Sequence, residues 1–445
     1  MTSTVPAPLH VLLPTIGSSG DVHPFVGLGQ ALLRRGHRVT LVTGGYFEPL
    51  VRAAGLEFAE LFPAEDYVRM LNDPDIWHSF RGPAKVMQLG IAPMIRRAYA
   101  KIAELHEAGR TIVGASTLSL GALVAQEKLG IPTATIHLQP VMIRSLAKPP
   151  KLAGMATAAW LPRSVIAAQY WLADRLVIDR LIGPELNAFR RELGLPPVTR
   201  VFGDRLHAPQ LTIGLFPDWF APPQADWPPQ VRLTGFPLYD EHDVTPLDAA
   251  VTEFLAAGTP PIAFTPGSAM TFGQEFFRAA VAACEQLGRR GILLTRHPEQ
   301  LPKSLPPTVR HFAYVPFTKL LPHCAALVHH GGMGTMSQAL AAGLPQVVMP
   351  MAHDQHDNVE RLEKLGVGRG LPPRKFTGRR LAAALRQLLS SPQVAESCRT
   401  VAAKLTDRSS LDDAAKLLEG LASGRGLSPP SERIRTAGIN PFGST

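Results

Sequence analysis

The sequence predicts an α/β protein of two Rossmann-like units that face each other across a cleft. Two stretches alternate short apolar segments with helical ones, a pattern typical of parallel sheets with right-handed crossovers. A polar, proline-bounded segment, Gly235–Pro246, separates the two stretches and is interpreted as a linker. Glycine-rich turns follow several apolar segments, and ligands of open α/β sheets bind at these carboxyl ends of the strands.

Length and composition indicate a globular chain. The 445 residues fit two or three domains at roughly 150 residues each. A hydrophobic fraction of 45% with 18% charged residues excludes a disordered chain. The absence of a run of about 18 apolar residues argues against a membrane-spanning helix, and the start lacks the pattern of a secretory signal. Cys284, Cys324 and Cys398 lie too far apart for a disulfide or zinc framework, so we expect a cytoplasmic protein.

The charge balance is basic, with 45 Lys and Arg against 36 Asp and Glu and a formal net charge of +9. Such a balance favours contact with phosphates or with an anionic membrane surface. The basic residues are scattered and accompany no nucleic-acid-binding motif, so no nucleic acid partner is expected. A solvated basic surface explains the charge equally well.

The first unit opens with the apolar run His10–Thr15, which predicts a buried strand. A turn at Gly17–Gly20 follows. Pro24–Arg35 predicts a helix, because proline is tolerated near a helix start and Gly36 ends the pattern. Further strands are expected at Arg38–Thr43, Leu56–Leu61, Thr111–Gly114, Thr133–His137, Gln210–Gly214 and Val231–Leu233.

Residues Val141–Ile182 interrupt this alternation. They contain Trp160, Trp171, many aliphatic residues and an excess of basic over acidic side chains. The composition predicts an inserted helical segment that is apolar on one side and cationic on the other. An ordinary helix covering the sheet is one interpretation, and a flap that faces the acceptor or a membrane is the other.

The second unit starts at Pro261. Its strands are expected at Ile262–Pro266, Gly291–Thr295, Val309–Ala313, Ala326–His330 and Gln346–Pro350. Its helices are expected at Gln274–Leu287, Leu320–His323, Met333–Ala342, Asn358–Leu365, Gly378–Leu389 and Leu411–Ala422. The tail from Gly424 is rich in Ser, Pro, Gly and Arg and is expected to fray.

The sequence HHGGMGT, His329–Thr335, combines a strand end, a glycine-rich turn and a helix start. Glycines let backbone amides approach an anion, and a helix N-terminus favours negative charge. The motif therefore predicts a phosphate site to which a histidine contributes, with a purely structural glycine turn as the alternative. Thr265–Ser268 also follows a strand and would bring the Ser268 hydroxyl to the same phosphate.

Two acidic residues at strand ends are candidates for chemistry. Asp354 with Gln355 forms a carboxylate–amide pair suited to sugar hydroxyls. Asp21 stands at a helix start after the first strand, where it would act as a general base. His23 is its rival, because the pKa of histidine suits that task. Helix capping is the alternative for both carboxylates.

Two clusters of metal-ligand types do not predict a metal site. Asp73-Pro74-Asp75 has a metal-chelating spacing, but it lies away from the strand ends, where Asp-Pro indicates a turn. The side chains of HDQHD, His353–Asp357, cannot all point inward from one turn. We expect neither a metal nor a cofactor.

Together these motifs resemble the GT-B glycosyltransferases of family 1. The resemblance covers residues 9–420 and is strongest over Tyr314–Val367, which is similar to the donor-binding signature of the family. TPGSA (Thr265–Ala269) and GSSGDVHPF (Gly17–Phe25) look closest to the branch of the rhamnolipid rhamnosyltransferase and sterol glucosyltransferases. The resemblance implies the GT-B fold, with a C-terminal helix that returns toward the first domain.

The resemblance also implies roles for individual residues. Asp21 matches the position of the catalytic histidine of plant members, and His330 contacts the donor's pyrophosphate. Tyr314 stands where plant members carry a stacking tryptophan, and Gln338 stands where they carry a ribose-binding glutamate, so UDP and dTDP both stay open. The implied donor-binding residues are Gly20, Ser268, Tyr314, Val315, His330, Gly332, Met333, Gly334, Thr335, Gln338, Asp354 and Gln355.

The expected function is an inverting, metal-independent transfer of a hexose from a UDP- or dTDP-sugar to a hydroxyl of a lipophilic acceptor. Trp160 and Trp171 are expected to contact that acceptor, which would be phenolic, sterol or terpenoid, macrolide, or a hydroxy fatty acid. A GT-B-fold nucleotide-sugar epimerase and a non-catalytic partner protein are the alternatives. Inversion needs one displacement, so no carboxylate nucleophile is required.

The expected domains follow from the same reading. Residues 1–236 would bind the acceptor, 237–250 would be the linker, and 251–405 would bind the nucleotide sugar. Residues 406–423 would form the C-terminal helix and 424–445 a flexible tail. The protein would be cytoplasmic, with peripheral contact at the inner face of the membrane as the alternative, and its oligomeric state is left open.

Overall fold

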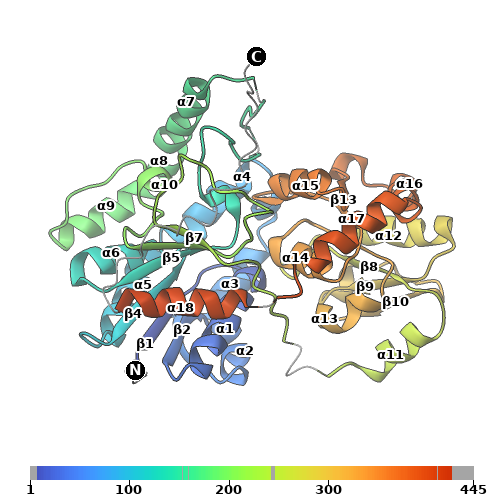
Figure 1. Cartoon of the computed structure of the whole chain (residues 1–445), viewed down its shortest axis with the longest axis horizontal. Coiled ribbons are helices and arrows are strands. Elements are labelled where there is room, and N and C mark those ends of the chain that lie inside the picture. Colours follow the sequence, from blue (N-terminus) through green and yellow to red (C-terminus); the bar gives the residue numbers. More distant parts are fainter. Residues whose placement is uncertain (1–7, 153, 159, 242–245, 408, 423–445) are drawn as a thin grey trace, which may run out of the picture.

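The computed structural model describes residues 8–152, 154–158, 160–241, 246–407 and 409–422. These residues form two parallel β-sheets with their helices, one from each half of the chain, lying side by side (Figure 1). The α/β architecture of two units predicted from the sequence is therefore confirmed. The flexible tail predicted at 424–445 lies outside the described residues, as do 242–245 of the predicted linker.

The first sheet has seven parallel strands in the order β3-β2-β1-β4-β5-β6-β7. Its central strands are buried on both faces, which explains why they are continuous apolar runs in the sequence. The strands are β1 His10–Pro14, β2 Arg38–Gly44, β3 Glu57–Phe62, β4 Thr111–Ser116, β5 Thr133–His137, β6 Leu211–Gly214 and β7 Val231–Leu233.

Helix α1 spans Ser19–Arg34 and starts earlier than the sequence predicts, so that Pro24 lies inside it. The reason is local, since Ser18 and Asp21 form a capping box that starts the helix directly after the glycine turn. The other helices of this half are α2 Glu48–Ala53, α3 Ala64–Leu71, α4 Arg81–Lys85, α5 Met94–Leu105, α6 Leu120–Leu129, α9 Gly183–Glu192 and α10 Val201–Asp204.

The inserted segment at Val141–Ile182 begins in a short 3-10 turn, Pro140–Met142, and has its longer helices in its second part. It contains α7 Arg163–Ala173, a π-helical turn at Asp174–Ile178 and α8 Asp179–Leu181. Arg144 anchors it through two hydrogen bonds of 2.8 and 2.7 Å to the buried carboxylate of Asp174. Figure 1 shows α7 projecting from the first half of the molecule, away from both sheets.

The second sheet has six parallel strands in the order β10-β9-β8-β11-β12-β13. The strands are β8 Ile262–Thr265, β9 Gly291–Leu294, β10 Val309–Phe312, β11 Ala326–His329, β12 Gln346–Val348 and β13 Gly368–Gly370. The helices are α11 Ala249–Ala256, α12 Gln274–Leu287, α13 Phe317–Leu320, α14 Met333–Ala341, α15 Gln355–Lys364, α16 Gly378–Leu389 and α17 Pro392–Ala403. Three elements of this half were not predicted from the sequence: β13, which is too short to show a period, α11 and α17.

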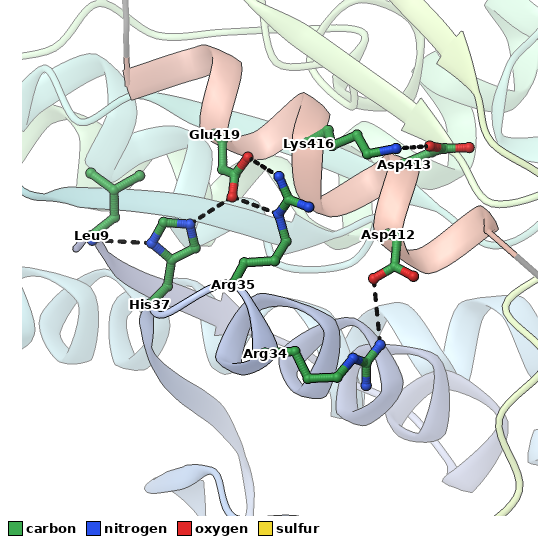
Figure 2. A network of polar contacts seen from close by, with 8 residues as sticks. All are labelled: Leu9, Arg34, Arg35, His37, Asp412, Asp413, Lys416 and Glu419. Carbon is green, nitrogen blue, oxygen red and sulfur yellow. Dashed lines mark hydrogen bonds and ion pairs between the residues drawn. The ribbon is translucent and has the colours of Figure 1, made fainter. Parts of the chain in front are cut away.

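The last helix, α18 (Ser410–Ala422), crosses back and packs against α1, as the family resemblance implies (Figure 1). Ala414, Ala415 and Leu418 are buried in the core of the first half. On the polar side, Glu419 accepts hydrogen bonds of 2.6 and 2.7 Å from Arg35 and contacts His37 at 2.8 Å (Figure 2). The two halves are therefore joined by the end of the chain as well as by the linker.

Within the described part of the chain, none of the helices combines the length and the apolar character needed to cross a membrane.

Candidate active site

The carboxylate of Asp21 lies at the carboxyl end of β1, in the first turn of α1. Its Oδ2 accepts a 2.8 Å hydrogen bond from the Ser18 backbone amide and a 3.2 Å bond from the Ser18 hydroxyl. Gly17 has a φ of +141°, and a Cβ there would collide with this carboxylate. Burial raises the pKa of Asp21, and the Ser18 hydrogen bonds oppose the rise. Asp21 is thus a positioned carboxylate that binds a proton more readily than an exposed one.

His23 faces a different part of the molecule. Its Nε2 lies 3.0 Å from Oε1 of Glu241, and its ring meets the ring of Tyr239 edge-on at 5.9 Å. Both partners belong to the linker. Two residues along a helix turn a side chain by about 200°, so Asp21 and His23 cannot share one face of α1. The structure therefore joins His23 to the linker rather than to Asp21.

The second half contributes a glycine-lined turn around His330. The imidazole lies between Gly267 after β8 and Gly332 at the N-cap of α14, and a Cβ at either glycine would collide with it. Burial lowers the pKa of His330 to about 4, so the ring is neutral at pH 7. Its Nδ1 is buried without a hydrogen-bond partner in the described chain. A ligand that accepts a hydrogen bond would satisfy this side chain.

The N-terminus of α14 adds backbone donors to the same turn. Gly332 is the N-cap and no side chain caps the helix, so the first-turn amides of Met333, Gly334 and Thr335 stay available to an anion. A partly exposed Thr335 and an exposed Ser268 bring hydroxyls from the predicted set. The predicted phosphate-binding residues thus surround one turn, and their binding of a phosphate stays a prediction.

The neighbouring His329 has a structural place. It is fully buried, its Nε2 lies 2.9 Å from Oε1 of Gln346, and its Nδ1 accepts a hydrogen bond from the amide of Gly331. Burial lowers its pKa to about 3. His329 therefore stabilises the glycine turn through the amide of Gly331. The side chain of His330 points to the opposite face of the sheet, as expected of neighbours in a strand.

Asp354 and Gln355 stand at the start of α15. Asn358 donates to Oδ2 of Asp354 at 2.7 Å and to the carbonyl oxygen of Gly331 at 2.9 Å, which ties this carboxylate to the glycine turn. The Oε1 of Gln355 accepts from the amides of Met351 and Ala352, so only its amide nitrogen is left to reach a ligand. Burial raises the pKa of Asp354 to about 7.

The two halves meet at this site. The negative charge of Asp21 also raises the pKa of Asp354, so the two carboxylates sense each other across the interface. His353, with a φ of +57°, lies edge-on to Trp77 with ring centres 6.2 Å apart. The backbone amide of Lys151 donates to Asp357 at 2.9 Å. Residues of the first half thus contact the loop that carries Asp354 and Gln355.

The expected base-binding residues lie near the linker. Val315 is buried, and the Tyr314 hydroxyl donates to the carbonyl oxygen of Asp240 at 2.8 Å. The guanidinium of Arg296 lies 5.1 Å from the centre of the Tyr314 ring. Gln338 is 6% exposed, and its Nε2 lacks a hydrogen-bond partner among the residues described. This amide is a spare donor for a bound ligand.

The acidic residues of Asp73-Pro74-Asp75, for which no metal site was predicted, lie next to basic side chains. Asp73 caps a short helical turn and lies 2.9 Å from Lys85, and Asp75 lies 3.1 Å from Arg81. The side chains of His353–Asp357 contact different partners, as described above. No group of three or more candidate metal ligands is found within the described ranges.

Trp160 and Trp171 are exposed to solvent, with 81% and 54% of their surface accessible. Helix α7, which carries Trp171, stands apart from α1 and α14 in Figure 1. Their predicted contact with an acceptor stays a prediction.

Sequence reasoning missed several residues of the site. The Ser18–Asp21 capping box and the four-residue spacing of Asp354 and Asn358 were readable as local helix signals. Glu241 and Arg296 gave no such signal, because each contacts a residue far away in the chain.

Comparisons with known proteins show the family to which the chain is related. Residues 290–421 match the family model described as "Erythromycin biosynthesis protein CIII-like, C-terminal domain". Residues 11–147 match the glycosyltransferase family 28 N-terminal domain.

Two relatives align over most of this chain. O-mycaminosyltylonolide 6-deoxyallosyltransferase of Streptomyces fradiae is 30% identical over 429 residues, which cover 94% of this chain and 98% of the relative. Sterol 3-beta-glucosyltransferase of Pichia angusta is 28% identical over 421 residues, which cover 90% of this chain and 33% of that longer protein.

Two solved structures share the fold. The kitacinnamycin glycotransferase aligns with a TM-score of 0.73 at 24% identity, covering 94% of this chain and all of the other. The glycosyltransferase VinC in complex with dTDP aligns with a TM-score of 0.67 at 18% identity, with 94% and 100% coverage.

Proposed function

The chain belongs to the GT-B glycosyltransferases of families 28 and 1, and we propose that it transfers a hexose from a UDP- or dTDP-sugar to a hydroxyl of a lipophilic acceptor. The transfer inverts the anomeric carbon and needs no metal. The position of Asn358 carries the proposal, because its side chain holds the carboxylate of Asp354 against the glycine turn beside His330. The reaction needs a base, a sugar-binding group and a diphosphate site close together.

In the proposed mechanism, Asp21 takes the proton of the acceptor hydroxyl. The acceptor oxygen forms a bond to the anomeric carbon as the bond from that carbon to the diphosphate oxygen breaks. A raised pKa suits Asp21 to this role, because a general base works best when its pKa approaches the working pH. Ser18 occupies Oδ2 and leaves Oδ1 to the substrate. His23 remains the rival base, and the contact of its Nε2 with Glu241, at 3.0 Å, leaves only Nδ1 to meet a substrate.

The leaving diphosphate develops negative charge, and the turn around His330 would stabilise that charge. A neutral imidazole and the free amides of the α14 N-terminus donate hydrogen bonds without being protonated first. These donors are fixed before the reaction, so little reorganisation is needed as the charge develops. Lys85 and Arg81 already pair with Asp73 and Asp75, which supports a reaction that does not use those carboxylates for a metal.

The donor would be either a UDP-sugar or a dTDP-sugar. The related VinC structure is a complex with dTDP, which supports a thymidine nucleotide. The Nε2 of Gln338, which lacks a hydrogen-bond partner in the described chain, would donate a hydrogen bond to the pentose. Plant members have a carboxylate at this position, which accepts a hydrogen bond instead. Tyr314, with Arg296 over its ring, would meet the base.

For the acceptor, the names of the relatives support a large and lipophilic molecule. One relative is named for O-mycaminosyltylonolide and the other for a sterol. The first half of the chain, residues 1–236, would bind it, and residues 251–405 would bind the nucleotide sugar. The two sheets support this division, with 237–250 as the linker.

The test is an incubation of the protein with UDP- and dTDP-sugars and a panel of phenols, sterols, macrolides and hydroxy fatty acids. We expect a glycoside whose anomeric configuration, read by NMR, is opposite to that of the donor. An epimerised donor without glycoside would favour the epimerase alternative. Tight donor binding without any product would favour the non-catalytic partner, and retention of configuration would contradict the mechanism.

A further inference from the structure

The helix from Arg163 to Ile178 is apolar on both sides. Ile166, Tyr170, Asp174 and Ile178, spaced four residues apart, are buried against the first half. The opposite side faces solvent, yet it also carries large apolar side chains. We call this outward surface the α7 face, and its exposed apolar residues are Val165 40%, Trp171 54%, Leu172 45%, Leu176 47% and Val177 44%, with Trp160, 81% exposed, in the turn that precedes the helix.

The charges around the α7 face have one sign. Arg163, Arg175 and Arg180 are exposed and have no ion-pair partner in the described chain. The two acidic residues of this segment are used internally. Asp174 is buried against Arg144, and the carboxylate of Asp179 accepts hydrogen bonds from the amides of Arg200 and Val201. The α7 face therefore presents tryptophan, aliphatic and arginine side chains without a compensating acid.

We propose that the α7 face docks the protein onto an anionic membrane surface. An interfacial helix combines exposed apolar residues, which enter the boundary of the acyl chains, with basic residues that meet lipid phosphates. Tryptophan is enriched at that depth, and each Arg near an anionic leaflet adds to binding. A two-fold contact between copies of the α7 face is disfavoured, because it would bring the same arginines together.

The docking surface is connected to the site. The backbone amide of Lys151, in the same inserted segment, donates to Asp357 at 2.9 Å, and its Nζ lies 3.4 Å from Glu360 in α15. A membrane that dissolves the lipophilic acceptor would then supply it to the half of the molecule that is proposed to bind it. This use of the surface rests on the proposed function, whereas membrane binding itself does not.

The test is sedimentation of the full chain with vesicles made of equal parts phosphatidylcholine and phosphatidylglycerol, or of phosphatidylcholine alone. We expect binding to the anionic vesicles, weakened by salt. The double variant Arg163→Gln/Arg175→Gln should bind about 25-fold more weakly, which corresponds to about 1 kcal/mol for each arginine. Trp171→Ser should lose about tenfold by removing apolar contact area.

The matched control is Arg374→Gln/Arg379→Gln, which removes the same charge from exposed positions in the second half. This control should bind vesicles like the wild type, and melting curves should show that all variants are folded. Equal losses in both double variants would overturn the proposal in favour of unspecific attraction by net charge. The proposal would also be overturned if the wild-type protein did not bind anionic vesicles. It would be overturned, too, if the wild-type protein self-associated and Trp171→Ser abolished that self-association. None of these outcomes depends on a sugar donor or an acceptor.

Discussion

Asp21 and Asp354 come from different halves of the chain, and the negative charge of Asp21 contributes to the raised pKa of Asp354. Burial is the main reason that the pKa of Asp354 rises to about 7, and the negative charge of Asp21 adds to the rise. Asp21 is also held with a raised pKa, chiefly by burial. Two acids in such surroundings do not both ionise freely at neutral pH. The pair therefore links the proposed base to the proposed sugar-binding residue.

The first prediction concerns the base. Asp21→Asn removes the proton acceptor but keeps the shape and the Ser18 contact, so the donor should bind normally while turnover falls roughly 10²–10⁴-fold. Steady-state kinetics and donor titration measure the two effects. His23→Ala is the control, because His23 contacts Glu241. If His23→Ala abolishes turnover while Asp21→Asn retains it, the base is His23.

The second prediction concerns pH. If ionised Asp354 accepts hydrogen bonds from the sugar, donor affinity should fall as the pH drops through about 7, because protonation removes an acceptor. Free dTDP or UDP lacks the sugar and should not show this step. In Asp21→Asn, one cause of the raised pKa is gone, so the fall should move to lower pH. Calorimetric titration from pH 5 to 8 would measure it. A flat profile for the sugar donor would contradict the role of Asp354.

The third prediction separates the two histidines. His330→Ala should weaken binding of both the free nucleotide diphosphate and the sugar donor by about 1.5–3 kcal/mol, as for a hydrogen bond to a charged group. His329→Ala should instead lower the melting temperature, because His329 is buried and bonded to Gln346 and Gly331. Unchanged diphosphate binding in a folded His330→Ala protein would remove His330 from the proposed site.

The fourth prediction concerns the returning helix. Hydrogen bonding to Arg35 lowers the pKa of Glu419 in the folded protein below its unfolded value near 4.5. The ionised Glu419 side chain therefore stabilises the fold above pH 4.5, and this stabilisation is lost as the pH falls through the lower pKa of the folded state. At pH 7, Glu419→Gln should destabilise the protein by about 1–2 kcal/mol. The difference should vanish in strong acid. Thermal melting at several pH values is the measurement.

The control for this variant is Lys416→Ala on the same helix. Lys416 pairs with Asp413 at 2.8 Å within α18, on the exposed side (Figure 2). Surface pairs of this kind contribute little. If Lys416→Ala destabilises the protein as much as Glu419→Gln, the contact to Arg35 and His37 is not what holds α18 on α1.

The fifth prediction concerns metal ions. Turnover should be unaffected by EDTA, because helix amides and His330 are proposed to meet the diphosphate charge. Activity that disappears in EDTA and returns only with Mg²⁺ or Mn²⁺ would contradict this and direct attention back to Asp73 and Asp75.

The sequence by itself determined the two parallel sheets, the strand ends and the glycine turn before α14. These features are local, because strands buried on both faces form continuous apolar runs and because a tight turn requires glycine. Asp21, His330 and Asp354 could be proposed as site residues for the same reason, since each lies in the turn or helix start that follows a strand.

Only the tertiary structure decided how these candidates relate to each other. It joined His23 to Glu241, placed Arg296 over Tyr314, and brought Asp21 close enough to Asp354 to change its pKa. It also left one of two apolar sides of α7 exposed to solvent, although the composition of that segment also allowed a helix that only covers the sheet. The physical reason is the same for these three contacts and for the exposure of α7. Each contact or exposure depends on how distant segments pack, and neither periodicity nor a short motif encodes the partner that lies across an interface.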